Sequence, residues 1–218
     1  FIENCYSTGS VGSSTQTDRQ VGCIGGLVGE NAGSIKNCCS TSSVKGYVYV
    51  GGLVGNNDSG SIENCYSTGS VEGNLHVGGL VGQHVDLDWE HDPVVGFVKN
   101  CYSVSPVRGN VVIGGLAGSC NGYIENSYSA GLVEGNSRVG GLVGVARGPN
   151  FIASSFWDIQ TSGQLSSDGG EPKTTAELKQ RSTFENADWD FERVWAIDEG
   201  TSYPYLRPNE QVPHPGLS

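Results

Sequence analysis

The sequence predicts an all-β fold: a parallel β-solenoid (β-helix) of about five to six coils, with a C-terminal aromatic-rich cap that contains a short helix. Two observations predict it. A Val-Gly-Gly-Leu-Val-Gly block recurs five times, and an Ile-Glu-Asn-Cys-Tyr-Ser block recurs alongside it. Both blocks are short, β-branched or aromatic, bounded by turn residues, and free of a helical apolar period. Self-similarity at a period of roughly 20–50 residues is typical of stacked repeats.

The spacing of the two blocks defines the coil. The first glycines of the glycine block lie 26, 27, 36 and 26 residues apart: Gly25, Gly51, Gly78, Gly114 and Gly140. The second block begins at six β-branched residues: Ile2, Ile35, Ile62, Val98, Ile124 and Ile152. We expect about three short strands per coil, stacked as parallel strands about 4.8 Å apart. Insertions at 13–19 and about 83–96 are expected to be loops.

The glycines inside the strand need a reason, because glycine weakens a strand unless another group approaches it closely. We therefore expect aromatic side chains or another strand to cover positions such as Gly79.

Composition and charge exclude some classes of function. The chain has 34 glycines in 218 residues and a formal charge of −11, which disfavours nucleic acid and anionic membranes as partners. No apolar run approaches the roughly 18 residues of a membrane span.

The chain begins inside a repeat without Met or a signal peptide, so we expect a fragment or processed product. Its uncapped N-terminal coil is a candidate surface for end-to-end self-association.

The seven cysteines invite a metal or redox interpretation. Four occupy one column, which serines continue: Cys5, Cys38, Cys65, Cys101, Ser127 and Ser155. No Cys-x-x-Cys pair or zinc spacing is present. We favour a stack of small buried side chains, mostly reduced, with at most one disulfide.

An aromatic column and an asparagine column follow the same repeat. The aromatic column is Tyr6, Tyr66, Tyr102, Tyr128 and Phe156, interrupted by Cys39. Stacked aromatic residues stabilise a solenoid, whereas an exposed row would bind sugar rings; we favour stabilisation. The asparagines (Asn4, Asn37, Asn64, Asn100 and Asn126) are expected to form a hydrogen-bonded ladder at a turn.

The third-coil insertion carries the one candidate metal site. Its acidic residues occupy every second position: Asp86, Asp88, Glu90 and Asp92. Alternating oxygen ligands resemble a calcium loop, although the glycine and final glutamate of an EF-hand are absent. The alternative is a solvated acidic loop. Trp89 and His91 are the accompanying candidates for contact with a ligand.

The repeat decays after Val145, and the sequence divides into solenoid repeats at 1–154, a capping segment at 155–208 and a loose tail at 209–218. Thr174-Thr175-Ala176-Glu177 is a capping box that predicts a short helix over 175–181. Three of the four tryptophans lie beyond residue 150. A solenoid must cover its last coil to prevent edge-to-edge pairing.

The combination of Asn-Cys-Tyr-Ser-x-Gly-x-Val with Gly-Gly-Leu-Val-Gly resembles the GLUG-motif repeat over about residues 1–146. The C-terminal segment is similar to the ending that commonly follows such repeats in large secreted bacterial proteins. The resemblance implies an extracellular or cell-surface setting, in adhesin-like proteins and in non-catalytic regions of secreted peptidases. It supplies no catalytic residue and no cofactor.

These observations predict a non-catalytic rigid spacer or adhesion scaffold, whose partner is an extracellular protein or a glycan. Two alternatives stay open: a carbohydrate- or calcium-binding module centred on the third-coil insertion, and a polysaccharide-degrading enzyme built on a β-helix. An enzyme needs a paired general acid and base. The alternating Glu and Lys residues at Glu3, Lys36, Glu63, Lys99 and Glu125 look instead like a solvent-facing ladder.

Overall fold

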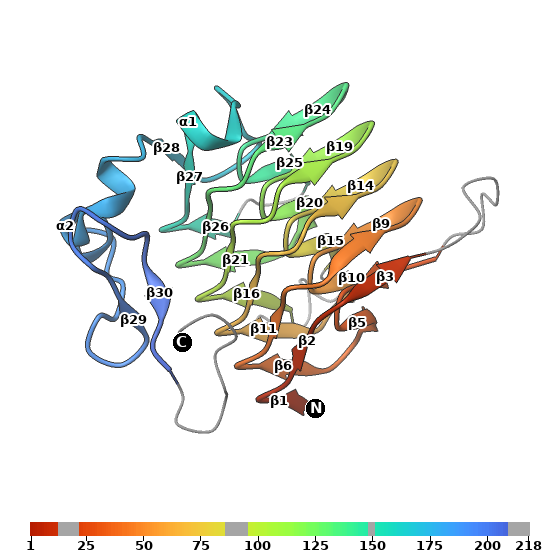
Figure 1. The fold of residues 1–218 in the computed structure, drawn as a ribbon, viewed down its shortest axis with the longest axis horizontal. Coiled ribbons are helices and arrows are strands. Elements are labelled where there is room, and N and C mark those ends of the chain that lie inside the picture. Colours follow the sequence, from red (N-terminus) through yellow and green to blue (C-terminus); the bar gives the residue numbers. More distant parts are fainter. Residues whose placement is uncertain (13–21, 86–95, 148–150, 209–218) are drawn as a thin grey trace.

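The chain forms a parallel β-solenoid, as predicted (Figure 1). The computed structural model describes residues 1–12, 22–85, 96–147 and 151–208. Each full coil contributes five short strands rather than the expected three, and strands of the same kind stack in register as five parallel sheets, which we call A to E in chain order. The extra strands arise because both blocks supply two strands: the glycine block bends at its centre, and the Ile-Glu-Asn-Cys-Tyr-Ser block turns at its left-handed asparagine.

Three of the sheets come from the Ile-Glu-Asn-Cys-Tyr-Ser block and the valine that follows it. Sheet A contains β1 (Ile2–Glu3), β6 (Ser34–Lys36), β11 (Ser61–Glu63), β16 (Phe97–Lys99), β21 (Tyr123–Glu125) and β26 (Phe151–Ala153). Sheet B contains β2 (Tyr6–Ser7), β7 (Cys39–Ser40), β12 (Tyr66–Ser67), β17 (Tyr102–Ser103), β22 (Tyr128–Ser129), β27 (Phe156–Asp158) and β28 (Glu171–Lys173). Sheet C contains β3 (Ser10–Gly12), β8 (Ser43–Lys45), β13 (Val71–Glu72), β18 (Val107–Arg108) and β23 (Val133–Glu134).

The glycine block supplies the other two sheets. Sheet D contains β4 (Ile24–Gly25), β9 (Val48–Gly51), β14 (Leu75–Gly78), β19 (Val111–Gly114) and β24 (Ser137–Gly140). Sheet E contains β5 (Val28–Asn31), β10 (Val54–Asp58), β15 (Val81–Val85), β20 (Ala117–Asn121) and β25 (Val143–Ala146).

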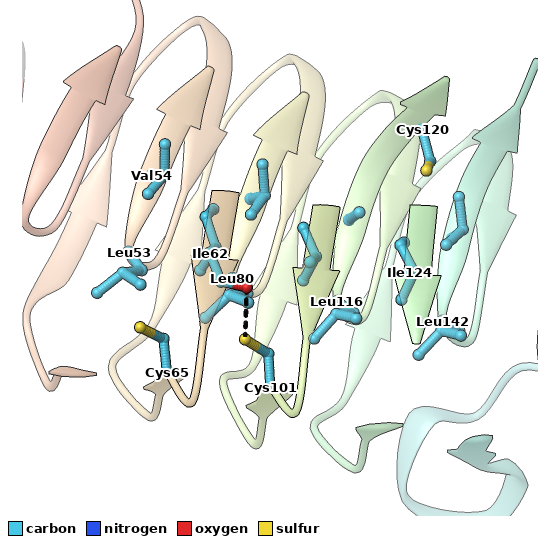
Figure 2. Packing of buried hydrophobic residues seen from close by; sticks show 14 of the residues in the cluster. Leu53, Val54, Ile62, Cys65, Leu80, Cys101, Leu116, Cys120, Ile124 and Leu142 are labelled. Carbon is cyan, nitrogen blue, oxygen red and sulfur yellow. Dashed lines mark hydrogen bonds between the residues drawn. The ribbon is translucent and has the colours of Figure 1, made fainter. Parts of the chain in front are cut away.

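Two apolar cores fill the coil. One lies between sheets A and E and contains the leucine of every glycine block; Figure 2 shows Leu53, Leu80, Leu116 and Leu142 stacked along the axis. The other is a stack of β-branched residues between sheets C and D, including Val71. Like residues therefore contact like residues from coil to coil, which confirms the predicted register.

The paired glycines allow the backbones of different sheets to touch. A Cβ on Gly78 would lie 2.6 Å from the Gly118 nitrogen, in sheet E of the next coil. A Cβ on Gly79 would collide with the Gly115 carbonyl and with Ser103 of sheet B. The expectation that another strand covers Gly79 is confirmed, and aromatic side chains are not what covers it.

The serine of Cys-Tyr-Ser completes this contact, because its hydroxyl donates to a glycine carbonyl across the coil. Ser129 Oγ lies 2.7 Å from the Gly141 oxygen, and Ser67 bonds Gly79 in the same way. The two repeated blocks recur together because each fills the space that the other leaves.

The C-terminal segment begins with α1 (Ile159–Ser162) and continues through a 3₁₀ turn (Glu177–Lys179), α2 (Arg181–Glu185) and an antiparallel pair, β29 (Trp195–Ala196) and β30 (Tyr205–Leu206). The capping box forms: the Thr174 nitrogen donates to Glu177 Oε2 at 2.7 Å, and the Glu177 nitrogen donates to Thr174 Oγ1 at 3.2 Å. The turn it starts is 3₁₀, and the α-helix begins later than predicted, at Arg181.

This segment contacts the solenoid in two places. Ser166 and Ser167 bond the exposed end of the last coil, where Ser167 Oγ accepts from the Val143 nitrogen at 2.9 Å. The remainder runs down the flank of sheet B, as Figure 1 shows for α2, β29 and β30.

Candidate functional site

The outer faces of sheets A and C carry ladders of alternating charge. Lys36 pairs with Glu63 at 3.0 Å and Lys99 with Glu125 at 2.7 Å in sheet A. In sheet C, Lys45 pairs with Glu72 at 2.9 Å and Arg108 with Glu134 at 2.6 Å. Each pair joins two neighbouring coils, so these carboxylates are partners of basic side chains, as expected of a solvent-facing ladder.

Asparagine forms the ladder that the sequence predicts. Five asparagines hold the left-handed backbone conformation with φ between 48° and 55°: Asn4, Asn37, Asn64, Asn100 and Asn126. Their side chains bond along the axis, with Asn64 Nδ2 donating to Asn37 Oδ1 at 3.1 Å and Asn100 Nδ2 donating to Asn64 Oδ1 at 3.2 Å. Asparagine tolerates this conformation better than most residues, so the ladder is structural.

The cysteine column is a packing column among the described residues. Cys65 and Cys101 are fully buried, and no cysteine forms a disulfide. The thiols donate to carbonyl groups of the coil, for example Cys101 Sγ to the Ile62 oxygen at 3.6 Å (Figure 2). Burial raises the pKa of Cys65, and a hydrogen bond with Cys65 raises that of Cys38, so both thiols stay protonated and are poor metal ligands.

The aromatic column is not available to a sugar along most of its length. Tyr66, Tyr102 and Tyr128 stack with ring centroids 4.9 and 5.2 Å apart. The C-terminal segment covers them with Trp189 and Trp195, and Tyr128 is 1% exposed. Stabilisation, the favoured interpretation, therefore accounts for the covered part of the column.

A depression of about 420 Å³ lies between β28 and α2. Its charged groups already have partners: Lys173 Nζ is 3.1 Å from Glu171 Oε2 and lies over the Phe156 ring, and Glu177 is part of the capping box. Hydrogen bonds from Thr174 lower the pKa of Glu177. The lining offers fixed structural contacts rather than an acid facing a base.

All six residues of the predicted third-coil site (Asp86, Asp88, Trp89, Glu90, His91 and Asp92) lie outside the described residues, so the calcium site stays a prediction. Within the described ranges, no three His, Cys, Asp or Glu side chains gather as a metal site would require. No helix there is long and apolar enough to cross a membrane.

The family model of the GLUG motif matches residues 46–72. Residues 46–72 carry the GLUG motif. The matched stretch is one circuit of the solenoid, because it runs from the end of β8 through β9, β10, β11 and β12 to the end of β13. The GLUG unit is therefore one coil, in which the glycine pair and the Cys-Tyr-Ser serine meet across the interior.

Two proteins resemble these GLUG coils. A protein of Evansella cellulosilytica described as a Gly-rich membrane protein is 46% identical over 54 residues, which cover 25% of this chain and 6% of the relative. A crystal structure from Bacteroides ovatus described as an immunoglobulin A1 protease matches with a TM-score of 0.54 and 26% identity. That match covers 94% of this chain and 57% of the other. The chain thus spans little more than half of the matched structure and a small fraction of the membrane protein.

Sequence reasoning missed a second column of left-handed residues in the GLUG coils. It lies in sheet D, two residues before the glycine pair, and consists of Tyr49, His76, Val112 and Arg138 with φ between 51° and 63°. The constant offset from the glycine pair was the available signal. None of these residue types indicates the conformation, so the column became visible only in the structure.

Proposed function

We propose that the chain is a non-catalytic repeat module of an extracellular or cell-surface protein and acts as a rigid spacer or adhesion scaffold. One observation carries the proposal: the residues that begin each Ile-Glu-Asn-Cys-Tyr-Ser block pair in unbroken register from Ile2 through Ile62 to Ile152. Neighbouring coils are joined by backbone and apolar contacts, and several of them also by amide hydrogen bonds and ion pairs. Such a stack resists bending, and each added coil extends it by about 4.8 Å.

The matched proteins support the setting. One relative is described as a membrane protein and the matched structure as an immunoglobulin A1 protease. A setting at or beyond the cell surface agrees with both descriptions, and there a module that holds other domains at a fixed distance is useful. Protease treatment of intact cells that express the parent protein tests this: cleavage of the module only after lysis would contradict it.

Small-angle X-ray scattering on the isolated chain tests rigidity. The expected result is one particle shape, described by the solenoid and unchanged between low and high salt. A profile that requires several bent conformers would contradict the spacer role. Mass measurement of the same sample tests whether the N-terminal coil, the candidate surface, mediates end-to-end association, which a strict monomer would rule out.

The two alternative functions lead to separate measurements. A polysaccharide-degrading enzyme would release reducing ends from polymeric substrates, whereas the ion-paired glutamates of sheet A favour the ladder. A calcium-binding module would bind Ca²⁺ in a calorimetric titration, and replacing Asp88 and Glu90 with Asn and Gln would abolish that heat.

A further inference from the structure

The second left-handed column is costly to the protein. Residues other than glycine lose roughly 1–2 kcal/mol in this conformation, with asparagine the usual exception. The first such column uses asparagine at five of its six rungs, with Ser154 at φ 48° in the last, whereas the second uses none and even places a β-branched residue there, Val112 at φ 63°. The backbone alone would favour asparagine at both places. The side chains of the second column are therefore retained for a property other than backbone fit.

Part of this column forms a polar and aromatic surface across two sheets. The rings of Tyr49 and His76 lie 5.2 Å apart at an interplanar angle of 36°. His76 Nδ1 lies 2.9 Å from Ser119 Oγ, which belongs to sheet E of the next coil. Both rings are only partly buried. The hydrogen bond fixes the imidazole, so the two rings present a pre-oriented stack to solvent.

Two arginines lie further along the same surface. Arg138 occupies the same column two coils beyond His76, and Arg147 follows β25, where its nitrogen donates to the Cys120 oxygen at 2.8 Å. Burial lowers the pKa of His76, and the charges of Arg147 and Arg138 lower it further. His76 is therefore neutral at pH 7, and the positive charge of this surface comes from the guanidinium groups.

These arginines differ from the basic residues of the charge ladders. Lys36, Lys45, Lys99 and Arg108 each pair with a glutamate of the next coil. Arg138 and Arg147 form no ion pair with a described residue, although the chain as a whole carries a charge of −11. The Asp168 carboxylate lies close to the backbone of this surface, since its Oδ2 accepts from the nitrogen of Ala146, the residue before Arg147, at 2.8 Å. The guanidinium groups of Arg138 and Arg147 are thus exposed on an acidic protein, and neither pairs with a glutamate of a described coil.

We propose that Tyr49, His76, Arg138 and Arg147 form a binding strip for an acidic polysaccharide whose charges are the carboxylates of uronic acid residues. The apolar C–H faces of a sugar ring pack on partly exposed aromatic rings. A guanidinium binds a carboxylate through two parallel hydrogen bonds. This inference goes beyond the spacer role, since a spacer needs no binding surface.

The direction of the strip explains why the ligand is a polymer. Its residues follow one another along the solenoid axis, with His76 and Arg138 separated by two coils, or about 9.6 Å. They line a side of the stack rather than enclosing a small molecule. An extended polyanion matches such a row, because one polymer reaches both the ring pair and the arginines across the intervening rung, where Val112 is buried, and each additional contact adds to the affinity.

The test uses polygalacturonate as the probe and calorimetry on the whole chain. Wild-type protein is expected to bind the polymer, more weakly as salt is added. The Arg138→Ala, Arg147→Ala double variant should bind at least about tenfold more weakly, because charge-assisted hydrogen bonds are lost. Arg193→Ala is the matched control: Arg193 is also exposed and forms no ion pair with a described residue, but lies in the C-terminal segment. It should bind as the wild type does.

A second variant separates binding from folding. His76→Asn removes the ring but places a residue that suits φ 53°, so it should weaken binding while the melting temperature stays the same or rises. The proposal is overturned if wild-type protein ignores polygalacturonate, if the double variant binds equally, or if dextran sulfate, which carries no carboxylate, or fully methyl-esterified polygalacturonate binds in place of the free acid. The scattering measurement of rigidity is independent of all these outcomes.

Discussion

The GLUG coils and the C-terminal segment are stabilised in opposite ways. In the coils a residue contacts copies of itself, as Leu53, Leu80 and Leu116 do along the axis. In the C-terminal segment each aromatic residue contacts a different partner: Trp195 lies 4.5 Å from Trp189 and 6.2 Å from Tyr128, between ring centroids. A substitution in a coil should therefore weaken the contacts along one column, whereas a substitution in the C-terminal segment should detach the whole segment from the coils.

Specific polar contacts fix the segment to the last coils. Asp158 is fully buried and its Oδ2 accepts from Tyr203 and Thr175, both at 2.6 Å. Tyr128 donates its hydroxyl to the Pro204 oxygen at 2.6 Å, and Trp189 Nε1 donates to the Ser154 oxygen at 2.9 Å. The comparison therefore predicts two unfolding units of different stability, since repeat arrays need not unfold in a single step.

The largest effect is expected at the centre of the aromatic cluster. Trp195 is 0% exposed, and replacing such a residue with alanine costs about 3–5 kcal/mol. Trp195→Ala should release the C-terminal segment, measured as a loss of near-ultraviolet ellipticity and rapid proteolysis beyond Lys173, while the far-ultraviolet β signal persists. Joint loss of both signals would contradict the separate units.

Trp195→Phe is the matched control for that experiment. Trp195 Nε1 has no hydrogen-bond partner among the described residues, so a smaller ring without this donor removes volume but no bond. Trp195→Phe should therefore lose clearly less stability than Trp195→Ala, and the segment should stay protected from protease.

The second-largest effect is expected inside the coils. Gly79→Ala would press a methyl group against the Gly115 carbonyl and Ser103, and overpacking of this kind costs about 1–3 kcal/mol, occasionally more. Denaturant unfolding followed by far-ultraviolet circular dichroism measures it. Gly12→Ala is the control, because its new Cβ would lie 3.4 Å from the nearest atom, the Lys45 oxygen. Equal stability of the two variants would show that the close approach at Gly79 is unimportant.

The same contrast explains what the sequence could predict. Each column of the coils recurs in the sequence, so register, the asparagine ladder and the buried cysteines followed from spacing alone. The path of residues 174–207 did not, because Phe184, Trp189 and Trp195 have no repeated partner to reveal where they pack. The left-handed column at His76 did not follow either, since its residue types give no sign of that conformation and only their constant offset from the glycine pair marks the position.

The asparagine ladder is expected to contribute less to stability. Two variants divide its contribution into a hydrogen-bond part and a backbone-conformation part. Asn64→Ala loses two amide bonds along the axis and places alanine at φ 53°, for a total of about 2 kcal/mol. Asn64→Gly loses the same bonds but tolerates the conformation. The difference between their unfolding free energies measures the backbone cost, and identical values would mean that the left-handed conformation is not strained for alanine.

The last prediction concerns stability at alkaline pH. Its effect at neutral pH is the smallest, and it separates the two regions best. Burial raises the pKa of Cys120 in the coils from 9.0 to about 12. Burial and then the hydrogen bond to Asp158 raise that of Tyr203 in the C-terminal segment from 10.0 to about 12. A group whose pKa is raised in the folded state stabilises the fold. This contribution is complete below the group's ordinary pKa and is lost as the pH rises through its pKa in the folded state.

Both regions should therefore weaken between about pH 9 and pH 12, with Cys120 contributing in the coils and Tyr203 in the C-terminal segment. Tyr203→Phe should flatten the pH dependence of tryptophan fluorescence, which reports on the C-terminal segment, and leave the far-ultraviolet signal of the coils unchanged. Cys120→Ala should flatten the pH dependence of the far-ultraviolet signal and leave the tryptophan fluorescence unchanged. Alanine suits this position because Ala146 occupies it in the next coil. If either variant flattened both signals equally, the coils and the segment would form a single cooperative unit.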